Sequence, residues 1–189
     1  MTEQELLIDC LRRLNASGIP YMLTGSMASN FWGVPRTTHD LDFVIQLSQS
    51  SAPALVAAFT PDFYLAEGSV LAALQPPYQF NAIDPRTGLK VDFWLLRPDP
   101  FEQEMFARRI GTELFNVWAW LATPEDVVLH KLYWNSITPS ERQLGDAAGV
   151  VAVQRDALDL DYLRRRAKEM GVDATLEDLL SGAIRPKQT

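Results

Sequence analysis

The sequence predicts an α+β protein, with a mixed β-sheet core flanked by helices and a C-terminal helical cap. Three observations predict this fold class. Short apolar runs bounded by turn residues dominate the first two-thirds of the chain and are typical of strands. Helical spacing and N-cap residues dominate from Thr123 onward. The 189 residues suffice for a sizeable core. We therefore predict a core at 1–122 and a helical region at 123–189 packed on it.

The elements follow from local signals. Thr2 and Glu5 have the spacing of a capping box, and Gly18 is expected to end the helix that begins there. Later elements are expected, in order, as a strand at 19–24, a short helix at 26–32, a strand at 40–45, a helix from about 50 to 59, strands at 78–83 and 89–96 forming a hairpin, a helix at 101–109, a strand at 113–118, and helices at 123–135, 140–153, 159–170 and 175–183. The stretch between Pro61 and Pro77 is ambiguous, with a short strand at 63–65 and a short helix at 69–74 as candidates.

Composition narrows the function classes. The net charge of −7 argues against a broad electrostatic grip on nucleic acid, although Arg164–Arg166 and Arg108–Arg109 are local basic stretches. The single cysteine, Cys10, allows no internal disulfide. The N-terminus is acidic and no apolar run approaches the ~20 residues of a membrane helix, so we expect a cytoplasmic protein without a membrane partner.

An Asp-Leu-Asp triplet carries the first chemical signal. On a strand at 40–45, the period of two places Asp40 and Asp42 on one face and turns Leu41 toward the core. Adjacent carboxylates repel each other unless a cation lies between them, and Mg²⁺ binds to a few carboxylates together with substrate phosphates. The triplet is therefore interpreted as half of a metal site. A solvent-facing acidic strand is the alternative.

A Gly-Ser turn precedes the triplet. Gly25 and Ser26 lie between an apolar strand and a short helix, where glycine permits close approach of a ligand and free N–H groups attract anions. Arg36 and Thr38 would add a guanidinium fork and a hydroxyl to this phosphate-binding site. Gly25 as an ordinary turn and Arg36 as the partner of an aspartate are the competing interpretations.

A third carboxylate follows in the hairpin. Asp92 stands alone in the apolar run at 89–96, and a core strand tolerates an unpaired carboxylate poorly. Asp92 therefore faces either solvent at an edge or the same cation as Asp40 and Asp42.

Together these motifs resemble the nucleotidyltransferase superfamily with the DNA polymerase β type of fold. The pattern Gly25-Ser26, then Arg36-x-Thr38-x-Asp40-x-Asp42, then Asp92, is closest to small bacterial members, including toxin-type nucleotidyltransferases of abortive-infection and toxin–antitoxin systems. Segments 123–132 and 158–163 are also similar. The resemblance implies a nucleotidyltransferase-like mixed sheet and places the catalytic core at 1–122.

The resemblance also implies a reaction. An acceptor hydroxyl would attack the α-phosphorus of a nucleoside triphosphate, with Asp40, Asp42 and Asp92 as catalytic residues and ligands of two Mg²⁺ ions. Asp92 would be the general base. Gly25, Ser26, Arg36, Thr38 and Lys131 would bind the triphosphate, with solvated lysine as the alternative for Lys131. Asp146 and Arg142 resemble charged residues on a cap helix of related proteins.

Two classes of function remain open. The first is an active nucleotidyltransferase that modifies a hydroxyl on a protein, a tRNA or a small molecule, as a toxin–antitoxin or phage-defence component or as an antibiotic-modifying enzyme. The second is a catalytically silent binding module or antitoxin. The presence of the Gly-Ser pair and all three aspartates favours the enzyme. A cognate toxin or antitoxin partner is a further expectation.

Overall fold

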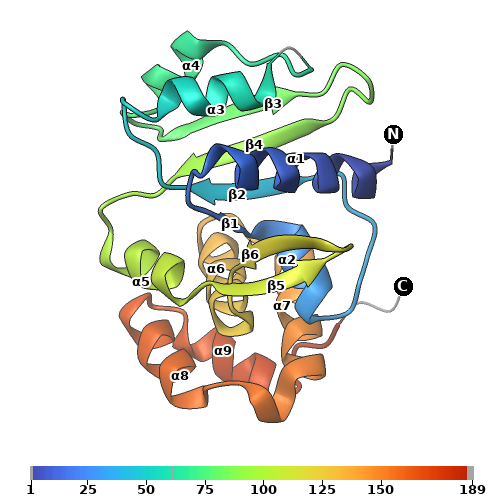
Figure 1. Cartoon of the computed structure of the whole chain (residues 1–189). Helices are drawn as coiled ribbons and strands as arrows, with labels where there is room; N and C mark the ends of the chain where they lie inside the picture. The colour runs from blue at the N-terminus through green and yellow to red at the C-terminus, as the bar shows by residue number, and fades with distance from the viewer. Residues whose placement is uncertain (1, 61, 187–189) are drawn as a thin grey trace. The chain divides into compact units, whose positions relative to one another are not determined.

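Figure 1 shows the computed structural model of the protein, which describes residues 2–60 and 62–186. The chain forms two compact units. The first comprises Met1–Thr24 and His39–Ala122, and the second comprises Gly25–Thr38 and Thr123–Thr189. The segment 25–38 thus groups with the C-terminal residues although it lies early in the sequence.

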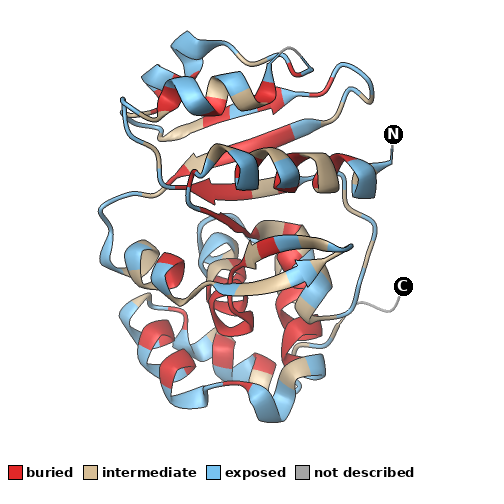
Figure 2. Ribbon diagram, in the orientation of Figure 1, coloured by how far each residue is buried: buried red, intermediate tan, exposed pale blue. Residues whose placement is uncertain are grey.

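The first unit is built on a six-stranded sheet in the order β3-β4-β2-β1-β6-β5. Its strands are β1 (Tyr21–Leu23), β2 (Leu41–Ile45), β3 (Gln79–Ile83), β4 (Lys90–Leu95), β5 (Ile110–Leu114) and β6 (Val117–Leu121). The sheet is mixed, because β2 pairs with β4 and β1 with β6 in parallel, whereas the other neighbours are antiparallel. β2 and β4 are mostly buried (Figure 2), as expected for central strands.

Helices of the first unit are α1 (Glu3–Ser17), α3 (Ala52–Phe59), α4 (Glu67–Ala72) and α5 (Pro100–Arg108). The predicted capping box of α1 is confirmed: the Thr2 side chain accepts from the N–H of Glu5, and the Glu5 carboxylate accepts from the N–H of Thr2. Gly18 ends α1 in the left-handed conformation, at φ 69°. α1 lies along the sheet next to α3 (Figure 1) and buries its leucines there.

One predicted strand is wrong. The stretch 113–118, expected as a single strand, contains a tight turn between β5 and β6. Phe115 and Asn116 have φ of 51° and 61°, the positive values of a two-residue hairpin turn. Asn tolerates this conformation, but Phe115 within an apolar run masked the turn. The candidate strand at 63–65 is only an isolated bridge between Tyr64 and Ile83.

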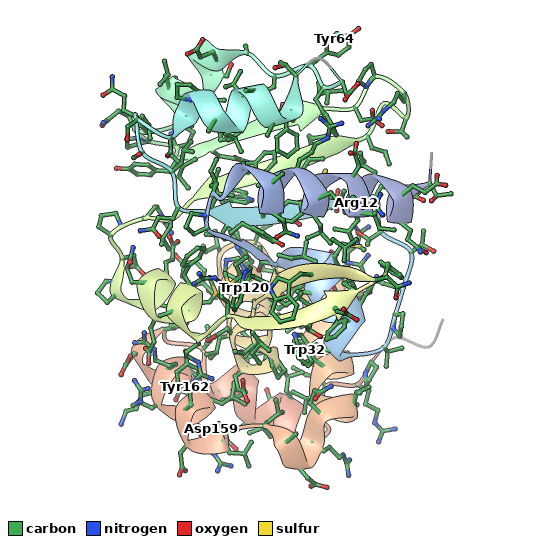
Figure 3. The ribbon with its side chains drawn as sticks, in the orientation of Figure 1. Arg12, Trp32, Tyr64, Trp120, Asp159 and Tyr162 are labelled. Atoms are coloured by element: carbon green, nitrogen blue, oxygen red, sulfur yellow. The ribbon has the colours of Figure 1, made fainter. Side chains whose placement is uncertain are left out.

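The second unit is helical. It contains α2 (Gly25–Trp32), α6 (Pro124–Ile137), α7 (Glu141–Gln154), the 3₁₀ turn η1 (Arg155–Ala157), α8 (Leu160–Glu169) and α9 (Asp173–Leu180). Thr123 caps α6 by accepting from the N–H of Asp126, with Pro124 at the first helical position. The buried Asp126 also accepts from the hydroxyl of Tyr162 at 2.6 Å, which ties α6 to α8 (Figure 3 labels Tyr162).

Two glycines bring α2 close to α7. A Cβ atom on Gly33 would lie 2.6 Å from the backbone nitrogen of Val150, and one on Gly149 would lie 3.2 Å from the nitrogen of Val34. A Cβ on Gly33 would clash with the α7 backbone and one on Gly149 would force its neighbour to shift, so glycine at both positions suits this approach of two backbones. The close packing fixes the position of the loop that follows α2, which carries Arg36.

The predicted fold class is confirmed as α+β with a mixed sheet and flanking helices. Within the residues that the structure describes, no helix is both long enough and apolar enough to span a bilayer.

Candidate functional site

The sheet of the first unit places two of the predicted carboxylates side by side. Asp42 on β2 and Asp92 on β4 are direct partners in the register of this parallel pair. Residues in register on neighbouring strands point to the same face. Leu41 and Phe43 are 1% and 0% exposed, which places the opposite face of β2 in the core. Asp40 precedes β2 by one residue and is exposed.

The polar row continues on either side of this pair. On the edge strand β3, Asn81 is the register partner of Asp92. On the other side, the N–H of Thr24 donates to the carbonyl of Asp42 at 3.0 Å, which extends the β1–β2 register by one residue. Two atoms of the row, Oγ1 of Thr24 and Oδ1 of Asp92, are buried without a hydrogen-bond partner. Buried polar atoms normally have partners, so the row is suited to receiving a ligand.

Lys90 is a member of this site that the sequence interpretation missed. Its Nζ donates to Oδ2 of Asp92 at 2.7 Å. The hydrogen bond to Asp92 raises the pKa of Lys90 against the opposing effect of its partial burial, and the charges of Asp92, Asp40 and Asp42 raise it further. Residues 90 and 92 alternate on one strand, so the sequence did contain the signal that they share a face.

The carboxylates of the first unit are the kind of ligand that a hard divalent cation prefers. Carboxylate oxygens are what Mg²⁺ binds, and the desolvated, unpartnered Oδ1 of Asp92 would gain a partner from such an ion. Among the described residues, no three or more His, Cys, Asp or Glu side chains form a group that could hold a metal ion. In this structure the ammonium of Lys90 is the cation on Asp92.

The second unit holds the predicted phosphate-binding side chains in an ion cluster. Arg36 donates to both carboxylate oxygens of Asp146, at 2.6 and 2.8 Å, and to Oγ of Ser26 at 2.9 Å. The buried Lys131 donates to Asp146 at 2.8 Å. We name these residues, Ser26, Arg36, Lys131 and Asp146, the Arg36 cluster.

Electrostatics hold the Arg36 cluster together. Burial alone would raise the pKa of Asp146, but the hydrogen bond from Arg36 and the charge and hydrogen bond of Lys131 bring it below its ordinary value. The three charged side chains carry one more positive than negative charge, which favours an anionic ligand. Arg36 therefore pairs with an aspartate, as one interpretation expected, and also contacts Ser26.

Asn30 fixes the backbone of Arg36. Its Nδ2 donates to the Arg36 carbonyl at 2.7 Å, and its Oδ1 accepts from the Arg36 N–H at 3.1 Å. The sequence interpretation missed this residue, because nothing local links an asparagine in a helix to an arginine six residues later. Gly25 begins α2 with φ of 61°, and Thr38 is partly exposed at the end of the same segment.

Solved structures similar to this protein are nucleotidyltransferase-like. An antigenic nucleotidyltransferase-like protein from Paracoccidioides brasiliensis matches with a TM-score of 0.56 and 16% identity over 98% of this chain and 94% of that chain. ANT(2″)-Ia in complex with adenylyl-2″-tobramycin matches with a TM-score of 0.61 and 13% identity over 89% of this chain and 98% of that chain. This chain has a nucleotidyltransferase fold. A solution structure of the antibiotic-resistance factor ANT(2″)-Ia agrees, with a TM-score of 0.54 and 12% identity over 95% of this chain and 94% of that chain.

The likeness confirms the predicted resemblance at the level of the nucleotidyltransferase fold. No protein-family model matches the sequence, and no curated protein sequence matches it. The roles of the aspartates, of the Arg36 cluster and of Mg²⁺ therefore stay predictions.

Proposed function

We propose that the protein is a Mg²⁺-dependent nucleotidyltransferase that moves a nucleoside monophosphate from a nucleoside triphosphate to a hydroxyl acceptor. One observation carries the proposal. Asp42 and Asp92 are register partners on β2 and β4 of a nucleotidyltransferase fold, and Oδ1 of Asp92 is buried without a partner.

Asp40, Asp42 and Asp92 would have to converge on the metal in order to hold it, because no three such side chains among the described residues already form a group that could do so. Asp42 and Asp92 are register partners, and Asp40 is one residue before β2, where continued alternation would put it on the same face. Divalent cations, when bound, would activate the acceptor hydroxyl and stabilise charge on the leaving pyrophosphate. Asp40 and Asp42 would serve both of the expected ions, and Asp92 one of them.

Asp92 is the proposed general base. The acceptor oxygen forms a bond to the α-phosphorus, the bond between that phosphorus and the β-phosphate oxygen breaks, and pyrophosphate leaves. The hydroxyl proton passes to a carboxylate oxygen of Asp92.

The Arg36 cluster is the proposed triphosphate-binding group. Asp146 holds the Arg36 guanidinium, Asn30 fixes the Arg36 backbone, and Lys131 adds a second cation. Such preorganised donors bind phosphate without first having to be ordered. The N–H groups that begin α2 at Gly25 and Ser26, and the hydroxyl of Thr38, would complete the set.

The acceptor class stays open among a protein side chain, a tRNA and a small molecule. The ANT(2″)-Ia structure contains an adenylylated tobramycin, which makes a small hydroxyl compound a reasonable first acceptor to assay. Incubation of the protein with α-labelled nucleoside triphosphates in a cell lysate tests a toxin–antitoxin role with a cognate partner.

A catalytically silent binding module is the second candidate function. It is favoured by the pairing of Asp92 with Lys90 and of Asp146 with Arg36 and Lys131, because these contacts occupy groups that catalysis would need. In that case nucleotide would bind to the protein without being consumed.

Incubation with Mg²⁺ and each of four α-labelled nucleoside triphosphates separates the two functions. If the protein is an active nucleotidyltransferase, label should appear on protein, RNA or an added hydroxyl compound, and Asp42→Asn should abolish this labelling. Bound nucleotide with no label on any acceptor would support the binding module instead.

A further inference from the structure

A lysine contacts one of the candidate metal-binding carboxylates. Lys90 is the first residue of β4, and its Nζ lies 2.7 Å from Oδ2 of Asp92. A short contact between an ammonium and a carboxylate is a charge-assisted hydrogen bond. The positive charge that Asp92 needs is thus provided by the chain itself.

We propose that the Lys90 ammonium takes the place of a divalent cation on Asp92, so that the protein binds a metal at this carboxylate only by displacing the lysine. The inference rests on the proposed function, since it concerns the same three aspartates. It assigns to Lys90 a role as the resident competitor of the metal.

One contact and its electrostatic consequence support this competition. The Lys90 contact uses Oδ2 of Asp92, one of the two oxygens that the residue offers to a metal. A divalent ion bound to the same carboxylate would lie within a few ångströms of the ammonium and repel it.

Lys90 can also leave. Its side chain is 53% exposed, against 11% for Asp92, so the flexible four-carbon stem can move into water while the carboxylate stays in place. In the absence of metal, the same ammonium lowers the repulsion among Asp40, Asp42 and Asp92. Lys90 therefore stabilises the metal-free arrangement and raises the metal concentration that is needed to replace it.

The test is a titration of the intact protein with Mn²⁺, with binding measured by electron paramagnetic resonance in the absence of nucleotide. Lys90→Met is expected to bind Mn²⁺ roughly tenfold more tightly than wild type, because the competing charge is gone. Its melting temperature should also rise more on addition of Mn²⁺. Lys90→Arg keeps a cation at this position and should bind Mn²⁺ as wild type does.

Lys168→Met is the matched control, since it removes the same charge from an exposed lysine on α8. Its Mn²⁺ affinity should equal that of wild type, and an equal gain in Lys168→Met and Lys90→Met would overturn the inference as a mere effect of net charge. Equal affinity in wild type and Lys90→Met, together with loss of binding in Asp42→Asn, would overturn the inference and leave the proposed function standing. If neither wild type nor Lys90→Met binds Mn²⁺, both fail. Circular dichroism checks that each variant is folded.

Discussion

Replacement of Asp146 by asparagine tests the Arg36 cluster most severely. In the wild type this carboxylate accepts two hydrogen bonds from Arg36 and one from Lys131. The asparagine amide would keep one acceptor oxygen. It would present an NH₂ group to the two cations in place of the second carboxylate oxygen, and it would carry no negative charge. Arg36 and Lys131 would then be left without this charge partner, with side chains 22% and 8% exposed.

The expected cost is set by this burial. Breaking a buried ion pair on one side costs ~3–5 kcal/mol, and the partial exposure of Arg36 argues for the lower end. We therefore expect Asp146→Asn to lower the free energy of unfolding by about 3 kcal/mol at neutral pH. Asp178→Asn, which changes an exposed carboxylate on α9, is the control and should change it by less than ~0.5 kcal/mol.

The contribution of Asp146 to the stability of the protein changes with pH in a definite direction. Because the pKa of Asp146 in the folded protein lies below its ordinary value of 3.8, its stabilising contribution is present above that value and is lost as the pH falls through the lowered pKa. Urea denaturation followed by far-UV circular dichroism should show the full gap between wild type and Asp146→Asn near neutral pH and a smaller gap in acid, below the ordinary pKa of 3.8. Equal stabilities at neutral pH would refute the buried-ion-pair account, and so would a gap that persists unchanged in acid.

Three further predictions concern single contacts in the second unit. Gly33→Ala should destabilise the protein by ~1–3 kcal/mol, because its Cβ would lie 2.6 Å from the nitrogen of Val150. Gly68→Ala is the control, because its Cβ would meet nothing within 4 Å. An equal effect of the two substitutions on the stability in urea would be evidence against the close packing of α2 on α7. Tyr162→Phe removes the hydroxyl that donates to buried Asp126 and should cost ~1–3 kcal/mol in the same assay, whereas an unchanged urea midpoint would show that this hydrogen bond contributes nothing. Arg36→Lys keeps the charge but loses the two-point contact with Asp146. Calorimetry should therefore show that the affinity for nucleotide falls about tenfold while the affinity for Mn²⁺ is unchanged. An unchanged affinity for nucleotide would show that Arg36 is not part of the phosphate site.

Local signals predicted the parts of the fold that depend on few residues. The capping box at Thr2, the glycine that ends α1 and the Thr123 cap of α6 each depend on a few consecutive positions, and all are present. The alternation of Asp40 and Asp42 with Leu41 likewise predicted which face of β2 is buried. The Phe115–Asn116 turn was missed because its positive φ angles belong to residues within a run that also suits a strand.

Contacts between distant segments could not be predicted in the same way. The pairing of Arg36 with Asp146 joins residues 110 positions apart, and it depends on Gly33 letting α2 approach α7. The register of Asp42 with Asp92 depends on a parallel pairing that no short motif encodes. The Lys90–Asp92 contact is different, because alternation on one strand already places both side chains on one face.

The central claim is that Asp42 and Asp92 share one divalent cation. A double-mutant cycle of Mn²⁺ affinity, with wild type, Asp42→Asn, Asp92→Asn and the double variant, measures this most directly. Shared coordination predicts strong non-additivity, with each single substitution weakening binding at least about tenfold and the second adding little more. Substitutions that leave Mn²⁺ affinity unchanged, or whose effects simply add, would contradict it.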